Sequence, residues 1–152
     1  MCRGKFDEAF KNARKAIELD SLSPMFNGDL GNGLLISGRF DEAIVQAHKT
    51  LELDPNYAKA HVTLGWCFLS KGDTAGAIDE FKKGKLLDPD PMYDVYLGCS
   101  YVAAGDRAKA EQVLHDLEDM ARQRYVSPEL RVRLLLKLGE KDKALDWLDK
   151  ML

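Results

Sequence analysis

The sequence lacks the features that mark a membrane-spanning or exported protein. It has no run of about eighteen or more apolar residues, which is the length that a helix needs to cross a bilayer. It has no signal peptide either, because Met1-Cys2-Arg3 leads directly into a segment with helical periodicity. The cysteines number three, and none of them lies in a Cys-x-x-Cys spacing. We therefore expect a cytoplasmic protein in a reducing compartment, with no membrane partner.

An excess of basic residues is missing as well. The chain has 22 Lys and Arg against 25 Asp and Glu, and its net charge is −3. Because nucleic-acid-binding surfaces are usually marked by a basic excess, this balance predicts no nucleic-acid partner. The 152 residues are 45% hydrophobic, which is enough for the core of one domain.

Catalytic and metal-binding motifs are also absent. There is no Ser-His-Asp arrangement and no His-Glu-x-x-His, and the glycine-rich residues 28–33 lack the order and the preceding strand of a nucleotide loop. Cys67 and Cys99 have no third and fourth ligand for zinc, so they are interpreted as buried small hydrophobes. The histidines, which we expect to be surface or packing residues, are His48, His61 and His115. The sequence predicts no enzyme, no cofactor and no metal.

What the sequence does contain, at residues 38–55, is an amphipathic helix with a marked beginning and end. A glycine turn is followed by Asp41-Glu42, whose negative charge complements the helix dipole in the first turn. Apolar residues then recur at steps of three and four, which places them on one face; they are Ala43, Ile44, Ala47 and Leu51. Asp54-Pro55 ends the helix, because the residue before a proline is pushed out of the helical region. Such a helix cannot bury its apolar face alone.

The same pattern occurs five times along the chain. Its central alanines are separated by 34, 34, 33 and 34 residues, and they are Ala9, Ala43, Ala77, Ala110 and Ala144. A second helical segment lies between successive copies. A unit of two helices that recurs at this spacing is the signature of a helical repeat array.

The residues of these units resemble the tetratricopeptide repeat family over nearly the whole chain. In that family the first helix carries Leu-Gly followed by an aromatic residue, and the second carries a small residue, a bulky residue and a terminal Asp-Pro. The segments that match are Leu64-Gly65 with Phe68, Leu97-Gly98 with Tyr101, the recurring alanines, Phe81, Leu53-Asp54-Pro55 and Leu87-Asp88-Pro89. Leu30-Gly31 fits less well, since Leu34 replaces the aromatic residue, and Arg131-Val132 depart from Leu-Gly.

The resemblance implies an all-α fold, a right-handed superhelical solenoid of antiparallel helix pairs with about four and a half repeats. The units are residues 4–23, which form a second helix only, and residues 24–57, 58–90, 91–124 and 125–152. Because the first unit lacks its first helix, we expect the chain to begin inside a longer array.

Individual helices carry further expectations. The helix at residues 6–20 is expected to pack through Phe10, Ala13, Ala16, Ile17 and Leu19. The helix that begins at Ser23-Pro24 contains three glycines, each costing about 0.5–1 kcal/mol relative to alanine, so it should be the softest. The helix from residue 108 has no Asp-Pro stop and should run through residues 122–124. The helix at residues 142–151 is expected to pack through Ala144, Leu145, Trp147 and Leu148.

The tail at residues 125–148 also resembles the C-terminal repeat arrays of a group of bacterial multidomain regulatory proteins. Those proteins begin with a winged-helix DNA-binding region or a protein kinase. The resemblance implies a regulatory parent and a sensor role for the array, although residues 1–152 contain no such effector domain.

The family resemblance also implies where a partner would bind. Stacked helix pairs form a concave surface, which the first helices line. Carrying the motif over gives Met25, Gly28, Asn32, Lys59, Val62, Trp66, Met92, Val95, Tyr96, Cys99, Glu129 and Arg133. Some family members grip a C-terminal carboxylate there, but Gly28 and Tyr96 occupy the places of two basic residues, so we do not expect that clamp.

Trp66 is the sharpest candidate, because tryptophan is enriched among residues that carry interface energy. Packing between adjacent repeats is its alternative role. The main functional hypothesis is a non-catalytic scaffold that binds a peptide or helix of a partner protein in the concave groove. The alternative is a homo-oligomer formed through the terminal helices.

Overall fold

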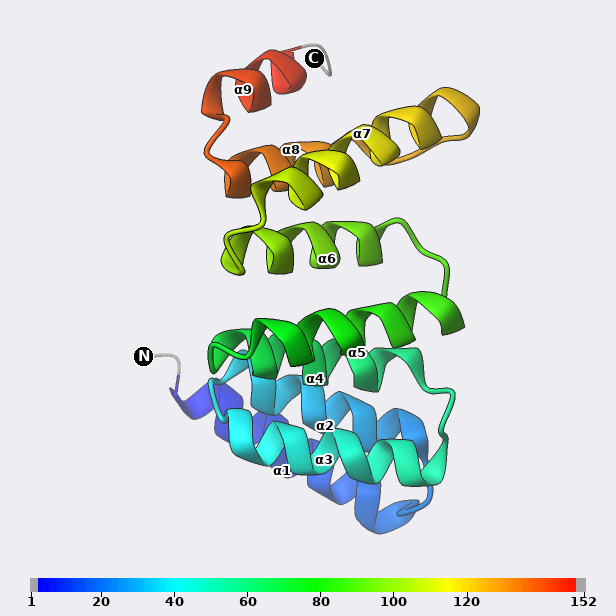
Figure 1. The fold of residues 1–152 in the computed structure, drawn as a ribbon. Helices are drawn as coiled ribbons and strands as arrows, with labels where there is room; N and C mark the ends of the chain where they lie inside the picture. Colours follow the sequence, from blue (N-terminus) through cyan, green and yellow to red (C-terminus); the bar gives the residue numbers. More distant parts are fainter. Residues whose placement is uncertain (1–2, 150–152) are drawn as a thin grey trace. The chain divides into compact units, whose positions relative to one another are not determined.

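The computed structural model describes the backbone of residues 3–149 and the side chains of residue 8 and residues 10–149. In this part of the chain all regular secondary structure is α-helical (Figure 1). The helices are α1 (Arg3–Leu19), α2 (Pro24–Ile36), α3 (Phe40–Leu53), α4 (Ala58–Ser70), α5 (Thr74–Leu87), α6 (Met92–Ala103), α7 (Arg107–Gln123), α8 (Pro128–Leu138) and α9 (Lys141–Asp149). The expected continuation of the last helix to residue 151 lies outside the described residues.

The helices pair as the repeats predict. Residues 1–87 form one compact unit and residues 88–152 form a second. In the first unit α2 packs on α3 and α4 packs on α5, while α2 and α4 also contact each other (Figure 1). In the second unit α6 packs on α7, α8 packs on α9, and α6 contacts α8. The predicted all-α fold of helix pairs is confirmed.

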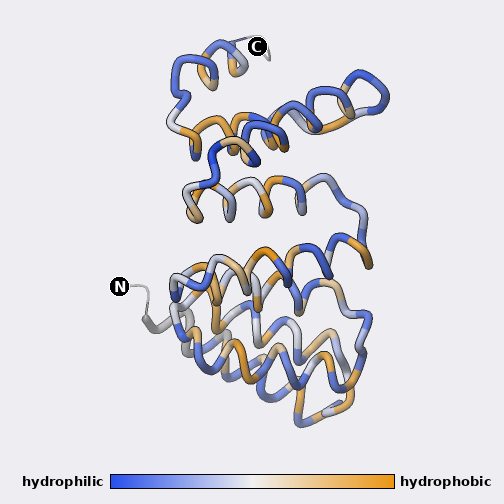
Figure 2. The backbone as a smooth tube through the Cα atoms, in the orientation of Figure 1, coloured by the Kyte–Doolittle hydropathy of each residue, from blue (hydrophilic) through white to orange (hydrophobic). Residues whose placement is uncertain are grey.

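The turns and caps follow from the sequence signals. Each glycine that precedes a second helix has a positive φ, a conformation that L side chains rarely adopt; these are Gly38 (77°), Gly72 (85°), Gly105 (77°) and Gly139 (82°). Ser23 Oγ accepts a hydrogen bond from the Phe26 amide at 3.3 Å, with Pro24 in the first helical position. Helix α7 ends at Gln123, one residue before the predicted end, because Arg124 has an extended backbone; its last turns are hydrophilic (Figure 2).

Glycine allows the closest helix contact in the first unit. A Cβ atom at Gly65 would lie 2.5 Å from Cε1 of Phe81, which is fully buried. Gly28, whose role the sequence does not explain, faces the ring of Tyr57, and a Cβ atom there would lie 2.6 Å from Tyr57 Cε1. The two rings therefore fill the space that these glycines leave open. The low stability expected for α2 stays a prediction.

The second unit also has a close helix contact at a glycine, and it contains a buried cation. A Cβ atom at Gly98 would lie 2.8 Å from Leu134, so this glycine brings α6 and α8 together. Arg131, which stands where the repeat has leucine, is buried with its guanidinium carbon 4.1 Å from the ring centroid of Trp147. Its Nε atom has no hydrogen-bond partner in the described part of the chain. The departure from the motif is therefore accommodated by an aromatic ring of α9.

Three leucines expected in the core, and Leu87 of the matched Leu-Asp-Pro segment, are exposed instead. Leu19 is 83% exposed, because it lies two residues after Ile17 and so points to the opposite side of α1 at about 100° per residue. Leu87 is at the last turn of α5, and Leu145 and Leu148 lie on α9 beside the buried Ala144. In the described residues no helix is long and apolar enough to span a bilayer.

Candidate functional site

In the first unit the predicted groove residues follow one side of α2 and one side of α4. Met25, Gly28 and Asn32 lie at helical positions i, i+3 and i+7 of α2, and so do Lys59, Val62 and Trp66 of α4; positions at this spacing share a helix face. Because α2 and α4 pack side by side, the two rows lie on neighbouring helices. Asn32 and Lys59 are exposed, whereas Val62 and Trp66 are half-buried.

Trp66 is held from within its own hairpin. Its ring meets that of Phe81 edge to face, with the centroids 5.5 Å apart and an angle of 70° between the planes. Phe81 is itself fixed by its burial against Gly65. The indole therefore combines an internal contact with α5 and a partly exposed surface, as a binding residue on a rigid support requires.

In the second unit three predicted residues lie close together on α6 and α8. Met92 and Tyr96 are half-buried and Arg133 is exposed, with its Nη1 atom 3.8 Å from the Met92 sulfur. The Tyr96 ring meets that of Tyr93 edge to face at 5.8 Å. Burial raises the pKa of Tyr96, and the Arg133 charge opposes that rise. Glu129 is exposed one turn before Arg133, so this face carries both signs of charge.

Two predicted groove residues do not reach the surface. Val95 is 0% exposed and Cys99 is 5% exposed, because both lie on the packed side of α6. Burial also raises the pKa of the Cys99 thiol, against the charges of Lys137 and Arg133, and it raises that of Cys67 to about 11. These cysteines are buried small hydrophobes, as the sequence predicts. Because Val95 and Cys99 are buried, they are no longer candidates for partner binding.

Lys137 belongs beside Arg133, although the sequence reasoning missed it. It is exposed on α8 one turn after Arg133, and its charge acts on the Cys99 thiol. The sequence signal that could have identified Lys137 is its i, i+4 spacing from Arg133 on the same first helix. With Met92 and Tyr96 these side chains form a face that combines apolar and cationic groups.

A polar cluster, in which His61 and Glu80 are buried and Lys83 is exposed, joins α4 to α5. His61 Nδ1 lies 2.7 Å from Glu80 Oε2, and Lys83 Nζ donates to Glu80 Oε1 at 2.6 Å. Burial alone would raise the pKa of Glu80, but the bonds from His61 and Lys83 outweigh it and hold that pKa below its usual value. No nucleophile among the described residues is bonded to this cluster, and its role is to fasten the hairpin. His48 and His115 are exposed.

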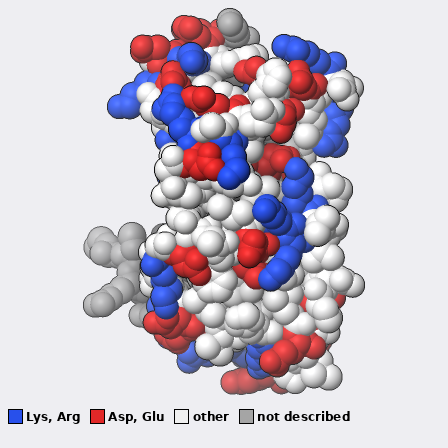
Figure 3. Space-filling view, in the orientation of Figure 1, with Lys and Arg blue, Asp and Glu red and all other residues white. Residues whose placement is uncertain are grey.

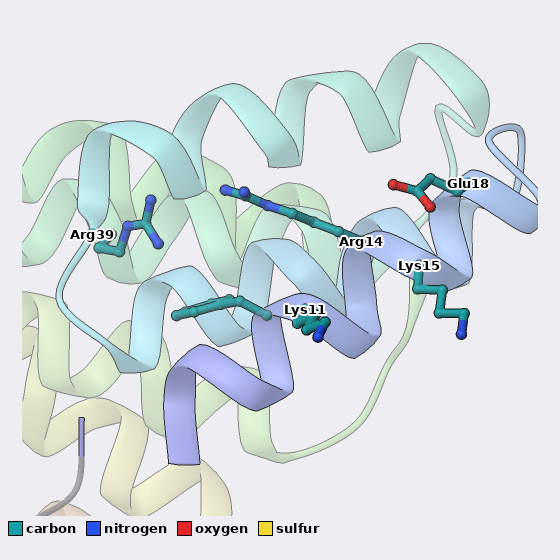
Figure 4. A pocket seen from close by; sticks show the side chains of 6 residues that line it. Lys11, Arg14, Lys15, Glu18 and Arg39 are labelled. Atoms are coloured by element: carbon teal, nitrogen blue, oxygen red, sulfur yellow. The ribbon is translucent and has the colours of Figure 1, made fainter. Parts of the chain in front are cut away.

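A separate hollow of about 400 Å³, called the α1 hollow here, is lined by one aromatic ring and mostly cationic side chains. Its lining residues are Phe10, Lys11, Arg14, Lys15, Glu18 and Arg39 (Figure 4). Arg39 lies over the Phe10 ring, 5.2 Å from its centroid, and its Nε and Nη2 atoms donate to the carboxylate of Glu42 at 2.7 and 2.5 Å. No sequence pattern marks this site, because residues 10 and 39 belong to different repeats.

Chemistry at a metal centre has no support in the described residues. They contain no group of three or more His, Cys, Asp and Glu side chains that could hold a metal ion. Basic and acidic side chains are interspersed over the face shown in Figure 3.

Comparison with known proteins agrees with this architecture. Residues 34–94 match the model of the tetratricopeptide repeat family. The structure of TTC0263, a thermophilic TPR protein of Thermus thermophilus, is similar with a TM-score of 0.79 and 21% identity, over 98% of this chain and 82% of that one. The fold is that of tetratricopeptide repeat proteins. No curated protein sequence matches the chain significantly.

Further solved structures share the tetratricopeptide repeat fold. A structure of the MamA protein has a TM-score of 0.66 and 21% identity, over 97% of this chain and 81% of that one. MamA residues 41 to the end, from Desulfovibrio magneticus RS-1, give a TM-score of 0.69 and 18% identity, over 98% of this chain and 86% of that one. At these identities the likeness concerns the fold. Tetratricopeptide repeats are generally non-catalytic and serve as protein-interaction scaffolds.

Proposed function

We propose that this chain is a non-catalytic scaffold that binds a peptide or a helix of a partner protein along its first helices. The observation that carries the proposal is Trp66, whose ring is fixed against Phe81 and yet partly exposed. Lys59 and Val62 lie on the same side of α4 and add charge and apolar area. A large aromatic residue with a rigid support is the usual centre of a binding surface.

The second unit supports the same function with a different chemistry. Met92 and Tyr96 offer adaptable apolar area, and Arg133 stands over them as a cation. A partner with an acidic residue beside an apolar one would complement this face. A scaffold role also agrees with a similar solved structure, that of Naa15/Naa10 bound to HypK-THB, which is a complex of several proteins. It has a TM-score of 0.50, and this chain covers 24% of it.

The test is selection of peptides from a displayed library on the full chain, followed by calorimetric measurement of their dissociation constants. We expect Trp66→Ala to raise the dissociation constants of the selected peptides about tenfold, because tryptophan is enriched among the residues that carry interface energy. Tyr125→Ala is the matched control, since Tyr125 is an exposed aromatic residue at the end of α7. Circular dichroism would verify that both variants fold. Selected peptides that bind both variants as well as the wild type would refute the proposal.

Self-association is the second candidate function, and exposed leucines in the second unit favour it. Leu136 of α8 and Leu145 and Leu148 of α9 are all exposed. Apolar area of this kind is often covered in a symmetric oligomer. A molecular mass that rises with concentration in sedimentation equilibrium would support this role, and a monomer at high concentration would favour the scaffold. The regulatory parent and the cytoplasmic location stay predictions, which the sequence of the parent gene would test.

A further inference from the structure

We propose that the α1 hollow and the hollow beside it form a second docking surface, which binds an acidic peptide segment that carries a neighbouring apolar residue. This surface is made by α1, α3 and the buried side of α2, and it does not include the groove residues of α4. The proposal therefore stands or falls independently of the role of Trp66.

The first argument is the charge of the α1 hollow. Lys11, Arg14, Lys15 and Arg39 line it, and Glu18 is its one carboxylate. The bond between Arg39 and Glu42 neutralises one of these cations. Arg14 forms no hydrogen bond or ion pair with a described residue, but its charge, after the bond from Arg39, helps to lower the pKa of Glu42. A hollow with this excess of positive charge attracts carboxylates.

The second argument is the arrangement of the guanidinium groups. Figure 4 shows Arg14 extending from α1 toward Arg39, which comes from the beginning of α3, while Lys15 points away from both. Stacking on Phe10 and the two bonds to Glu42 hold the plane of the Arg39 guanidinium in place. Glu18 lies on the other side of Arg14. A carboxylate between the two guanidinium groups would offset their repulsion, and the planar fork of arginine suits that ligand.

The third argument is the apolar hollow next to it, which has a volume of about 380 Å³ and shares Arg14. Leu30 and Leu34 of α2 are part of its lining, and so is Val45 of α3, which is 69% exposed. Val45 is thus an apolar side chain at the rim, one helical turn after Asp41 and Glu42, which carry the opposite charge to Arg14. An occupant with an apolar side chain beside its carboxylate would cover Val45 and reach Arg14 at once.

These features favour a peptide over the other anions that a cationic surface can attract. A nucleic acid or an anionic membrane needs a broad basic area, whereas Asp41, Glu42 and Glu18 border these hollows with negative charge. A short acidic peptide needs one or two cations and an apolar contact. The surface supplies both within two adjoining hollows.

The experiment measures fluorescence anisotropy of a labelled peptide, Gly-Glu-Glu-Leu-Leu-Glu-Glu-Gly, with the full chain. We expect saturable binding that weakens as NaCl rises from about 50 to about 500 mM, because salt screens exposed charges. Arg14→Glu should weaken binding about tenfold, and Lys11→Glu should weaken it in the same direction. Lys82→Glu is the matched control: it makes the same charge change on an exposed residue of α5 and should leave the dissociation constant within about twofold.

Two further arms separate the alternatives. Val45→Ser should weaken the binding of this peptide. It should not change the binding of an analogue in which serine replaces both leucines. Phosphatidylserine vesicles and single-stranded DNA are each tested as a competitor of the labelled peptide. Neither should bind the wild type more tightly than it binds the Arg14→Glu variant. Absence of saturable peptide binding, or equal effects of Arg14→Glu and Lys82→Glu, would overturn the proposal. So would binding of the vesicles or the DNA without binding of the peptide.

Discussion

Replacing Phe81 with alanine is expected to lower the free energy of unfolding by about 3–5 kcal/mol, the largest effect of any single substitution considered for this chain. Phe81 is fully buried, its ring fills the space over Gly65, and it supports the ring of Trp66. The cavity would lie directly against Gly65, because the Phe81 ring fills the space that this glycine leaves open in α4. Urea denaturation followed by circular dichroism measures the change.

The control for Phe81→Ala lies on the same helix. Leu86 is 86% exposed, so Leu86→Ala should change the free energy of unfolding by about 0.5 kcal/mol or less. If both variants lowered the midpoint equally, the contact between α4 and α5 would not depend on this ring. Loss of the Phe81 ring should also loosen Trp66, so a peptide that depends on Trp66 should bind the variant more weakly.

The second large effect is expected at Glu80. Glu80→Gln should lower the free energy of unfolding by about 2–3 kcal/mol at neutral pH, because it weakens charged bonds to His61 and Lys83 in a buried site. The folded-state pKa of Glu80 lies below its ordinary value of 4.5, so its stabilising contribution is present above that value and is lost as the pH falls. The difference between wild type and variant should therefore narrow as the pH falls from about 5 to about 3.

Two comparisons make the Glu80 prediction specific. Glu52→Gln changes an exposed carboxylate of α3 and should show no such dependence on pH. A double-mutant cycle with His61→Ala would show whether the two side chains stabilise the hairpin together, since residues in contact have non-additive effects. Additive effects of the two substitutions would contradict the role assigned to the His61–Glu80 contact.

The sequence predicted most of the fold because its signals are local. Ser23-Pro24 marks the beginning of α2, and the glycines before α3, α5, α7 and α9 have the left-handed conformation. Gly4, which occupies the same place in the first copy of the pattern, lies inside α1 instead. Gly65 and Gly98 were recognised from the motif, and both lie against a side chain of another helix. Local rules of capping, turn geometry and periodicity therefore suffice for the helices and their pairing.

The sequence predicted the candidate site less well, because exposure depends on which helices surround a residue. Lys59 is exposed and Trp66 is partly exposed, as expected for groove residues. Val95 is buried, although the repeat motif places it in the groove. The errors at Leu19 and Leu145 have a different cause, since each leucine lies near a packed residue in the sequence but on another face of its helix. The right-handed winding of the whole array and the division into units stay predictions.

Contacts between distant residues were beyond the reach of pattern reasoning. The stacking of Arg39 on Phe10 joins two repeats, and the bond between His61 and Glu80 joins two helices. Neither pair has a motif, and nothing in the sequence around either residue of a pair indicates its partner. The α1 hollow could therefore be recognised only from the arrangement of α1 and α3 in space.

The reach of the bonds between helices has a consequence for how such a chain can change over generations. Gln46 donates to Asn27, 19 positions away, and Arg133 contacts the sulfur of Met92, 41 positions away. Contacts at these sequence separations join residues of one helical pair or of two adjacent pairs. Tandem duplication or loss of one period would leave the remaining bonds with their partners, so the copy number of the repeat can drift while the binding surfaces of the retained pairs survive.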